Sequence, residues 1–182
     1  MSSTASQQTI DNLNAAFQGE SNAAHRYQAF ARKADADGYA YEARLFRAAS
    51  RAETIHAQNH RKAIEALGGV LQELKLSEVI VGTTAENLAE AIKGEKHEFE
   101  VMYPEFLVLA RQEDAKQAIR SMTYAMEVEV QHAKLYQAAL DNLGKNANVP
   151  LYVCGVCGET RLDLPEKCSV CNAAPRAFEE MV

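Results

Sequence analysis

Apolar positions recur every three or four residues through most of the first 145 residues, which is the period of amphipathic helices. Four such runs predict helices over about residues 6–34, 39–67, 83–110 and 114–143. Turn-forming residues separate the runs, with Asp35 to Gly38 after the first, Gly68 and Gly69 after the second, and Gly144 after the fourth. Four helices of this length, each about 40 Å long at ~1.5 Å per residue, predict a four-helix bundle.

Three details refine the predicted bundle. The link between the second and third helices is about fifteen residues long, so we expect it to cross the length of the bundle rather than form a tight turn. Thr83 and Glu86 have the spacing of a capping box at the start of the third helix. Pro104 lies inside that helix and predicts a bend or a local irregularity, because proline lacks the backbone N–H.

The last thirty residues have a different pattern. All four cysteines fall there as two Cys-x-x-Cys pairs, Cys154 with Cys157 and Cys168 with Cys171. Two such pairs predict a tetrahedral tetrathiolate metal site rather than disulfides, and both zinc and iron accept four thiolates. We therefore predict a bundle domain over 1–145, a linker over 146–151 and a small metal-bound domain over 152–182.

Composition and charge exclude several classes of function. The chain has 182 residues and a net charge of -6, with its Lys and Arg spread among Asp and Glu, so no nucleic-acid partner is expected. No run approaches the ~18 apolar residues of a membrane span, and the N-terminal sequence has no pattern of a signal peptide. We expect a cytoplasmic protein with no membrane partner.

The helices carry a repeated constellation of acids and histidines. Glu53-x-x-His56 in the second helix has a counterpart in the fourth, and an internal repeat also aligns two lone glutamates. Residues three apart share one face of a helix, so four carboxylates and two imidazoles face one interior. Burying them without cations would cost several kcal/mol for each charge, whereas two divalent ions neutralise four carboxylates. The predicted ligands of a di-iron site are Glu20, Glu53, His56, Glu95, Glu129 and His132.

Residues near the predicted ligands have alternative roles. Glu98 lies one turn beyond Glu95, where it is either a solvated surface glutamate or a seventh ligand that exchanges with His56 when the metals change oxidation state. Tyr27 and Tyr103 either hydrogen-bond ligand carboxylates or serve as core aromatics. His60, one turn beyond His56, either supports the ligands from behind or is partly exposed on its helix; exposure is the expectation, so His60 is left out of the predicted site, as are His25 and His97.

Together these motifs resemble rubrerythrin over nearly the whole chain. The resemblance is carried by AFQGES, AETIH, AIKGEKHEFEVMYPEF, EVEVQHAKLY and the cysteine module. It implies an all-α ferritin-like bundle with a rubredoxin-like C-terminal domain, two Fe ions in the bundle and one Fe, or Zn, in the cysteine site. It also implies Glu53 and Glu129 as bridging ligands, and the exchange of His56 with Glu98. The sequence departs from the family pattern at Ser169 and Asn172, where Pro and Gly are common, and in its short spacer between the cysteine pairs.

The resemblance implies a peroxidase that reduces hydrogen peroxide to water in oxidative-stress defence. Electrons would come from a reductase through the rubredoxin-type centre, which in the family lies near the di-iron site of a partner subunit, so a homodimer is expected. One alternative is a ferroxidase that sequesters iron. Another is a non-catalytic zinc-binding interaction module on a helical bundle.

Overall fold

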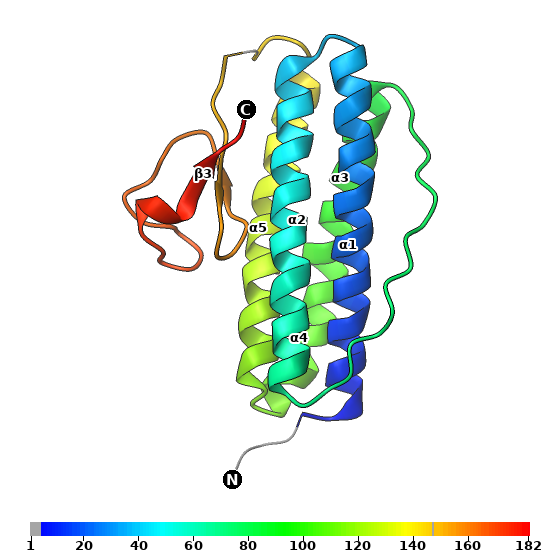
Figure 1. Ribbon diagram of the computed structural model, residues 1–182, viewed down its shortest axis with the longest axis vertical. Coiled ribbons are helices and arrows are strands. Elements are labelled where there is room, and N and C mark those ends of the chain that lie inside the picture. Colours follow the sequence, from blue (N-terminus) through cyan, green and yellow to red (C-terminus); the bar gives the residue numbers. More distant parts are fainter. Residues whose placement is uncertain (1–4, 147) are drawn as a thin grey trace.

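Four helical rods lie side by side and form the main body of the molecule (Figure 1). The computed structural model describes residues 5–146 and 148–182; the first four residues of the predicted bundle domain and Ala147 of the predicted linker lie outside that part. The helices are α1 (Gln7–Ala36), α2 (Ala40–Ala66), α3 (Thr84–His97), the π-helical segment η1 (Glu98–Met102), α4 (Tyr103–Gln112) and α5 (Lys116–Asp141). Segments α3, η1 and α4 together make the third rod. The predicted four-helix bundle is confirmed, with helix ends shifted by one or two residues.

Local chemistry explains where the rods begin and change pitch. Thr83 and Glu86 form the predicted capping box, in which each side chain accepts a hydrogen bond from the other residue's backbone N–H. The predicted irregularity of the third rod lies just before Pro104, where the Tyr103 N–H donates to the carbonyl of Glu98, five residues earlier. Because proline has no N–H to continue the regular ladder, the wider π turn absorbs the break.

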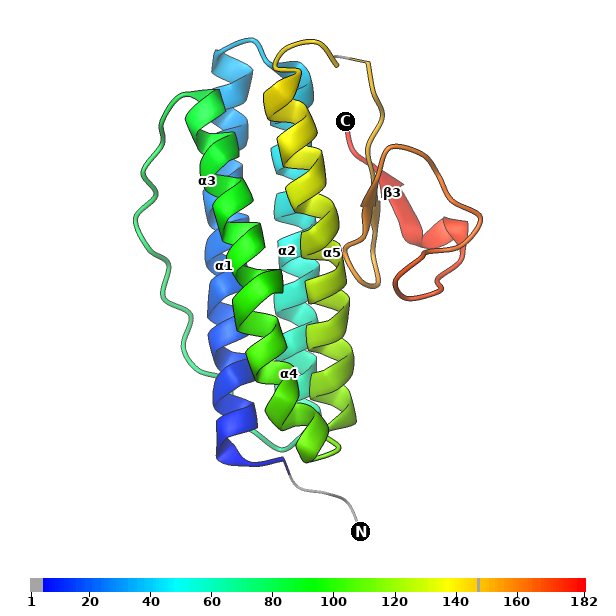
Figure 2. The same cartoon turned by 180° about the vertical axis from the view of Figure 1, so that it is seen from behind.

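The crossover from α2 to α3 runs extended along the outside of α1, as predicted (Figure 2). Three side-chain amides on one stripe of α1, Asn14, Gln18 and Asn22, hold it in place. Each amide donates to a crossover carbonyl and accepts from a crossover N–H, at 2.7–3.1 Å. These amides satisfy backbone groups of a segment that has no regular structure of its own.

The core consists of two apolar layers with a polar layer between them. Along α1, one apolar cluster takes Ile10, Leu13 and Ala16, and the other takes Ala23 and the residues that follow. Glu20 falls between them and is fully buried. The predicted acids and histidines of the site therefore lie at mid-height in the bundle.

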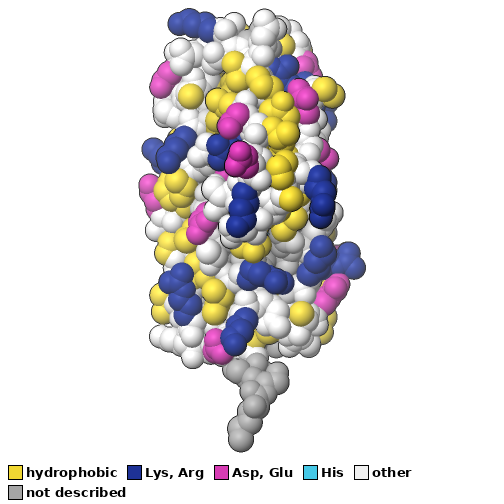
Figure 3. Space-filling view, turned by 90° about the vertical axis from the view of Figure 1, so that its left-hand side faces the viewer, with side chains coloured by type: hydrophobic (Ala, Val, Ile, Leu, Met, Phe, Trp, Pro, Cys, Tyr) yellow, Lys and Arg dark blue, Asp and Glu magenta, His cyan; other side chains and the backbone are white. Residues whose placement is uncertain are grey.

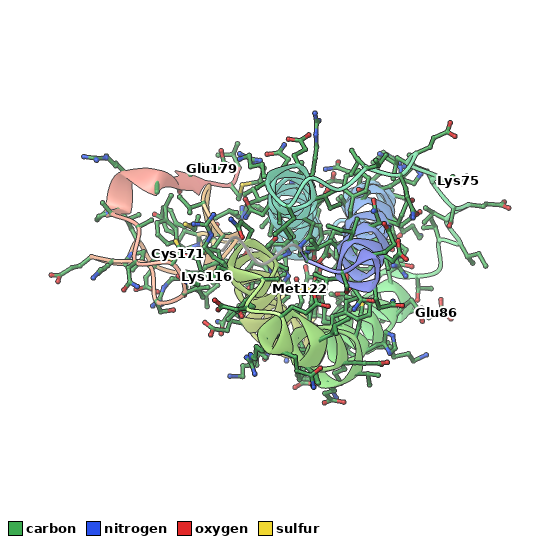
Figure 4. All side chains as sticks on the ribbon, turned by 90° about the horizontal axis from the view of Figure 1, so that it is seen from below. Lys75, Glu86, Lys116, Met122, Cys171 and Glu179 are labelled. Atoms are coloured by element: carbon green, nitrogen blue, oxygen red, sulfur yellow. The ribbon has the colours of Figure 1, made fainter. Side chains whose placement is uncertain are left out.

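The C-terminal residues form a small module beside α2 and α5 (Figures 1 and 4). Its antiparallel sheet has the order β2-β1-β3 and consists of β1 (Tyr152–Cys154), β2 (Thr160–Arg161) and β3 (Phe178–Glu180), with a short 3-10 turn η2 (Pro175–Ala177). Leu151 and Val153 are fully buried in an apolar cluster of the bundle. The module is thus packed onto the bundle of its own chain.

The face of the molecule that carries the module has a mixed surface. Acidic and basic side chains are interspersed with apolar ones on the face that carries the module (Figure 3). None of the described helices is both long enough and apolar enough to cross a membrane.

Candidate metal centres

Four helices bring the predicted bundle ligands to one buried point. Glu20 comes from α1, Glu53 and His56 from α2, Glu95 from α3, and Glu129 and His132 from α5. All six side chains are at most 1% exposed. Their donor atoms form two overlapping groups in which all atoms lie within 4.8 Å of one another: Glu20, Glu53, His56 and Glu129 in one, and Glu53, Glu95, Glu129 and His132 in the other.

The overlap gives the centre two halves that share two carboxylates. Glu53 and Glu129 belong to both groups, while each half has its own lone glutamate and its own histidine. The Nδ1 atom of His56 lies 2.9 Å from Glu53 Oε2 and 2.8 Å from Glu129 Oε1. The Nδ1 atom of His132 lies 2.9 Å from Glu129 Oε2 and 3.4 Å from Glu53 Oε1. This is the arrangement that two ions bridged by two carboxylates require.

Unpartnered polar atoms show that the donor set fits metal ions. Glu20 Oε2 and Glu95 Oε2 are buried and, among the described residues, have no hydrogen-bond partner, while the short contacts of both Glu129 oxygens with His56 and His132 lack hydrogen-bond geometry. Buried polar groups are normally paired, so a cluster of unpaired acceptors needs cations. Carboxylate oxygens and imidazole nitrogens are ligands for iron and other divalent ions, and two such ions would neutralise the four carboxylates.

The charges at the centre are strongly coupled. Burial and the charges of Glu53 and Glu129 raise the pKa of Glu20 well above its ordinary value, and burial with the charge of Glu129 does the same for Glu95. Burial alone would lower the pKa of His56, but the adjacent Glu129 and Glu53 outweigh it and raise that pKa. Protons and metal ions therefore compete for the same donor atoms.

Two tyrosines cross the bundle to reach the lone glutamates. Tyr27, on the helix of Glu20, donates to Glu95 Oε1 at 2.6 Å. Tyr103, at the start of α4, donates to Glu20 Oε1. Both rings are also part of the apolar core. These phenols fix the rotamers of the two carboxylates, as groups that contact metal ligands commonly do.

The expected exposure of His60 is wrong. Its side chain is fully buried, with Nε2 2.9 Å from the Tyr103 hydroxyl and Nδ1 2.8 Å from Ser121 Oγ. Burial and the charge of His56 lower the pKa of His60 to about 3, so its ring is neutral. Sequence reasoning missed it because its partners lie on other helices; the only signal was its position one turn beyond His56. His25 and His97, which were also left out of the predicted site, are exposed.

Glu98 lies beside the centre but outside both ligand groups. It is the first residue of η1 and is half-buried. Burial and the carboxylates of Glu20 and Glu95 raise its pKa. Its role as a seventh ligand stays a prediction.

The four cysteines converge in the C-terminal module. The Sγ atoms of Cys154 and Cys171 are 3.7 Å apart and those of Cys157 and Cys168 are 3.4 Å apart, far beyond a disulfide bond. A tetrahedron with ~2.3 Å metal–sulfur bonds has sulfur atoms separated by about 3.8 Å. Gly158 and Asn172 follow the two pairs with φ of +85° and +64°, as expected for knuckles that fold back toward sulfur.

A buried glutamate supports the second knuckle and was missed by the sequence reasoning. Glu159 is 4% exposed and accepts hydrogen bonds from the Ser169 N–H at 3.0 Å and from the Ser169 hydroxyl. It also accepts from the Cys168 thiol at 2.9 Å. Ser169 stands where the family pattern has proline, which could supply neither donor, so this departure from the pattern has a structural partner.

The two centres meet at the outer edges of the histidines. His56 Nε2 lies 2.9 Å from the Cys157 carbonyl oxygen, and His132 Nε2 lies 3.0 Å from Thr160 Oγ1. A proton on His56 Nε2 donates to that carbonyl, which orients the ring so that Nδ1 faces the carboxylates of Glu53 and Glu129. Contacts of this kind orient metal-bound histidines. A cysteine of one centre is therefore one hydrogen bond from a predicted ligand of the other.

Comparisons with known proteins agree with this geometry. The Rubrerythrin family model matches residues 11–140. Rubrerythrin-2 of Clostridium acetobutylicum is 37% identical, with 94% of this chain and 95% of the relative covered. Nigerythrin of Nitratidesulfovibrio vulgaris is 32% identical, with 93% and 85% covered.

Solved structures show the same relationship. A partially reduced nigerythrin has a TM-score of 0.88 at 32% identity and covers 97% of this chain and 88% of its own; another nigerythrin structure is described as fully reduced and all ferrous. A Mycobacterium tuberculosis bacterioferritin shares the fold, with a TM-score of 0.70 at 19% identity over 76% of this chain and 87% of its own. With its family model, its relatives and both cysteine pairs in place, this chain belongs to the rubrerythrin family.

Proposed function

We propose that the protein reduces hydrogen peroxide to water at a di-iron centre in the bundle, with electrons supplied through an iron tetrathiolate in the C-terminal module. The observation that carries the proposal is the hydrogen bond between His56 Nε2 and the Cys157 carbonyl. A redox-active module docked at this point supplies electrons to a buried catalytic site, which a purely structural zinc ribbon would not do.

The six predicted ligands would bind the two ions in a symmetric arrangement. Glu53 and Glu129 would bridge the two ions, and Glu20 with His56 and Glu95 with His132 would complete the two halves. Two bound iron ions would supply the electrons and the positive charge that polarises the O–O bond of peroxide. The apolar layers on either side exclude bulk water from the reacting atoms.

Glu98 and His56 would adapt the centre to its oxidation state. Oxidation of two irons adds two positive charges, and a carboxylate compensates for added charge better than a neutral imidazole does. The half-buried position of Glu98 beside the centre supports this exchange with His56. The π turn that begins at Glu98 gives its backbone an irregular geometry of the kind that recurs at functional sites.

Iron sequestration with ferroxidase activity is the less favoured alternative. The bacterioferritin likeness rests on 19% identity and shows the fold alone. A storage protein has no need of the docked cysteine module. The nigerythrin structure and the rubrerythrin relative, in contrast, cover 97% and 94% of this chain.

The test is a stopped-flow reaction of the anaerobically reduced protein with hydrogen peroxide, following the visible absorption of the iron–thiolate centre. The expected result is about three irons per chain and rapid reoxidation, lost in Glu129→Ala and strongly slowed in Glu98→Ala. Glu100→Ala is the matched control, because Glu100 is an exposed neighbour in the same segment. Zinc in the cysteine site, or reduced iron untouched by peroxide, would overturn the proposal.

A further inference from the structure

A chain of hydrogen bonds leads from the surface of the bundle to one of the predicted metal ligands. Ser121 Oγ lies 2.8 Å from His60 Nδ1, His60 Nε2 lies 2.9 Å from the Tyr103 hydroxyl, and that hydroxyl bonds Glu20 Oε1. These hydrogen bonds connect residues of α5, α2, α4 and α1 in that order. All its members are buried, with Ser121 at 5% exposed the outermost.

The outer end of the chain opens into a solvent pocket. Ser121 lines a cavity of about 300 Å³ between α2, α5 and the C-terminal module, together with Asn59, Lys62, Arg120, Tyr124 and Val156. Water occupies about 30 Å³ per molecule in the liquid, so this pocket has room for several water molecules. The side chain of Ser121 is therefore in contact both with solvent and with a ring that is fully buried.

The donors along the chain all point toward the metal centre. The Tyr103 hydroxyl donates to Glu20 Oε1, the direction that a metal-bound, and so ionised, Glu20 would also require, and its oxygen is then left to accept from His60 Nε2–H. A neutral His60 protonated on Nε2 leaves Nδ1 as an acceptor, so Ser121 is the donor there. Hydrogen bonds in series polarise one another in the same direction.

We propose that Ser121, His60 and Tyr103 form a proton relay that carries protons from this pocket to Glu20 and the reacting oxygen atoms. The inference rests on the proposed function, because reduction of one hydrogen peroxide by two electrons takes up two protons and yields two water molecules. In one inward pass a hydronium ion in the pocket gives a proton to Ser121 Oγ and becomes water, while the Ser121 hydroxyl proton moves to His60 Nδ1. The His60 Nε2 proton moves to Tyr103, and the Tyr103 hydroxyl proton moves through Glu20 to the peroxide oxygen. Reorientation of the imidazole ring, which presents its newly protonated nitrogen to Tyr103, together with rotation of the two hydroxyl groups, resets the relay for the second proton.

Ser121 is a positioning residue at the entrance, so its variants test the relay without touching a metal ligand. Ser121→Ala removes the entrance, Ser121→Thr keeps the hydroxyl, and Ser50→Ala is the matched control. Ser50 is also a buried serine, but its hydroxyl donates a hydrogen bond to Ala24 O and accepts one from Gln28 Nε2, away from the relay.

The first readout needs no peroxide. Full-length protein labelled with ¹⁵N-histidine and loaded with zinc, which is diamagnetic, reports hydrogen exchange of the His60 ring N–H with solvent by NMR. The relay predicts roughly 10- to 100-fold slower exchange in Ser121→Ala, with the parent rate in Ser121→Thr and Ser50→Ala. Unchanged exchange in Ser121→Ala would overturn the inference, as would equal slowing in Ser50→Ala.

The second readout is reoxidation of the reduced iron protein by peroxide. Ser121→Ala should slow it by roughly 10- to 100-fold and change its solvent isotope effect, while Ser121→Thr and Ser50→Ala keep the parent rate. A parent-like rate in Ser121→Ala would overturn the relay and leave the peroxidase proposal standing. A parent protein inert to peroxide would overturn the proposed function instead, and the exchange measurement would still decide whether the relay exists.

Discussion

Glu95 has opposite effects on the metal-free and the metal-loaded chain. Its pKa is raised by burial and by Glu129, so the folded metal-free protein is destabilised when this carboxyl ionises. Glu95→Gln removes the charge and keeps an oxygen that accepts from Tyr27. We expect it to stabilise the metal-free protein by about 1 kcal/mol at pH 7 while weakening metal binding.

The pH dependence follows from the sign of the shift. Below the ordinary glutamate pKa of about 4.3 the carboxyl is protonated in both the folded and unfolded chains, so the stabilisation by Glu95→Gln should vanish there and grow as pH rises. Urea unfolding of the chelated protein at several pH values measures it. Glu90→Gln, at an exposed site on the same helix, should change nothing at any pH. A loss of stability in metal-free Glu95→Gln at pH 7 would contradict the argument.

Gly158 marks the closest approach of the module to the bundle. It has φ of +85°, and a Cβ there would lie 2.6 Å from His56 Nε2 and 3.2 Å from Ala52 Cβ. Gly158→Ala should therefore displace the Cys157 carbonyl from His56 and slow reoxidation of the cysteine centre by peroxide, while the spectrum of that centre survives.

The control separates docking from backbone strain. Asn172 occupies the matching place in the second knuckle with φ of +64°, and Asn172→Ala imposes a similar penalty of about 1–2 kcal/mol for a left-handed residue. It should leave the reoxidation rate unchanged. Equal slowing in both variants would mean that strain in the module, and not its contact with His56, controls the rate.

The crossover depends on the amide stripe of α1. Four helical residues rise about 6 Å, which is close to the length of two extended residues, so each amide of the stripe meets successive peptide groups of the crossover. Gln18 donates to Glu73 O at 2.7 Å and accepts from Lys75 N at 3.0 Å. Gln18→Ala should lower the free energy of unfolding by about 1 kcal/mol and speed hydrogen exchange of the Lys75 amide.

A nearby glutamine gives the comparison. Gln8 lies on the same helix, but its amide bonds only the exposed side chain of Asn12, so Gln8→Ala should change stability by less than about 0.5 kcal/mol. If Gln18→Ala changed the free energy of unfolding as little as Gln8→Ala, the ends of the crossover, and not the amide stripe, would hold it in place.

Periodicity and motif spacing were enough to predict the elements and the convergence of Glu53, His56, Glu129 and His132, because these features are local or repeated in the chain. The buried position of His60 was not predictable in this way, since its two partners come from other helices. The pairing of Glu159 with Ser169 was hidden for the same reason. Contacts between elements depend on how faces pack, which a single helical period does not specify.

The whole molecule places both centres within one chain. The resemblance led us to expect electron transfer from the module of a partner subunit, yet here Cys157 and His56 of the same chain are in contact, and Leu151 and Val153 are buried against the bundle. This arrangement is compatible with a homodimer but gives the partner no required part in electron transfer.

A mixing experiment therefore tests the architecture. Glu129→Ala abolishes the bundle centre and leaves the cysteines, whereas Cys168→Ala abolishes the cysteine centre and leaves the bundle. If each module serves its own bundle, co-expression of the two chains should yield no more peroxide-driven turnover than the two variants assayed apart. Co-expression of each variant with a tagged parent chain, followed by co-purification, shows whether mixed oligomers form. Restored turnover in such mixed oligomers would place electron transfer between subunits, because only there could an intact cysteine centre meet an intact bundle of another chain.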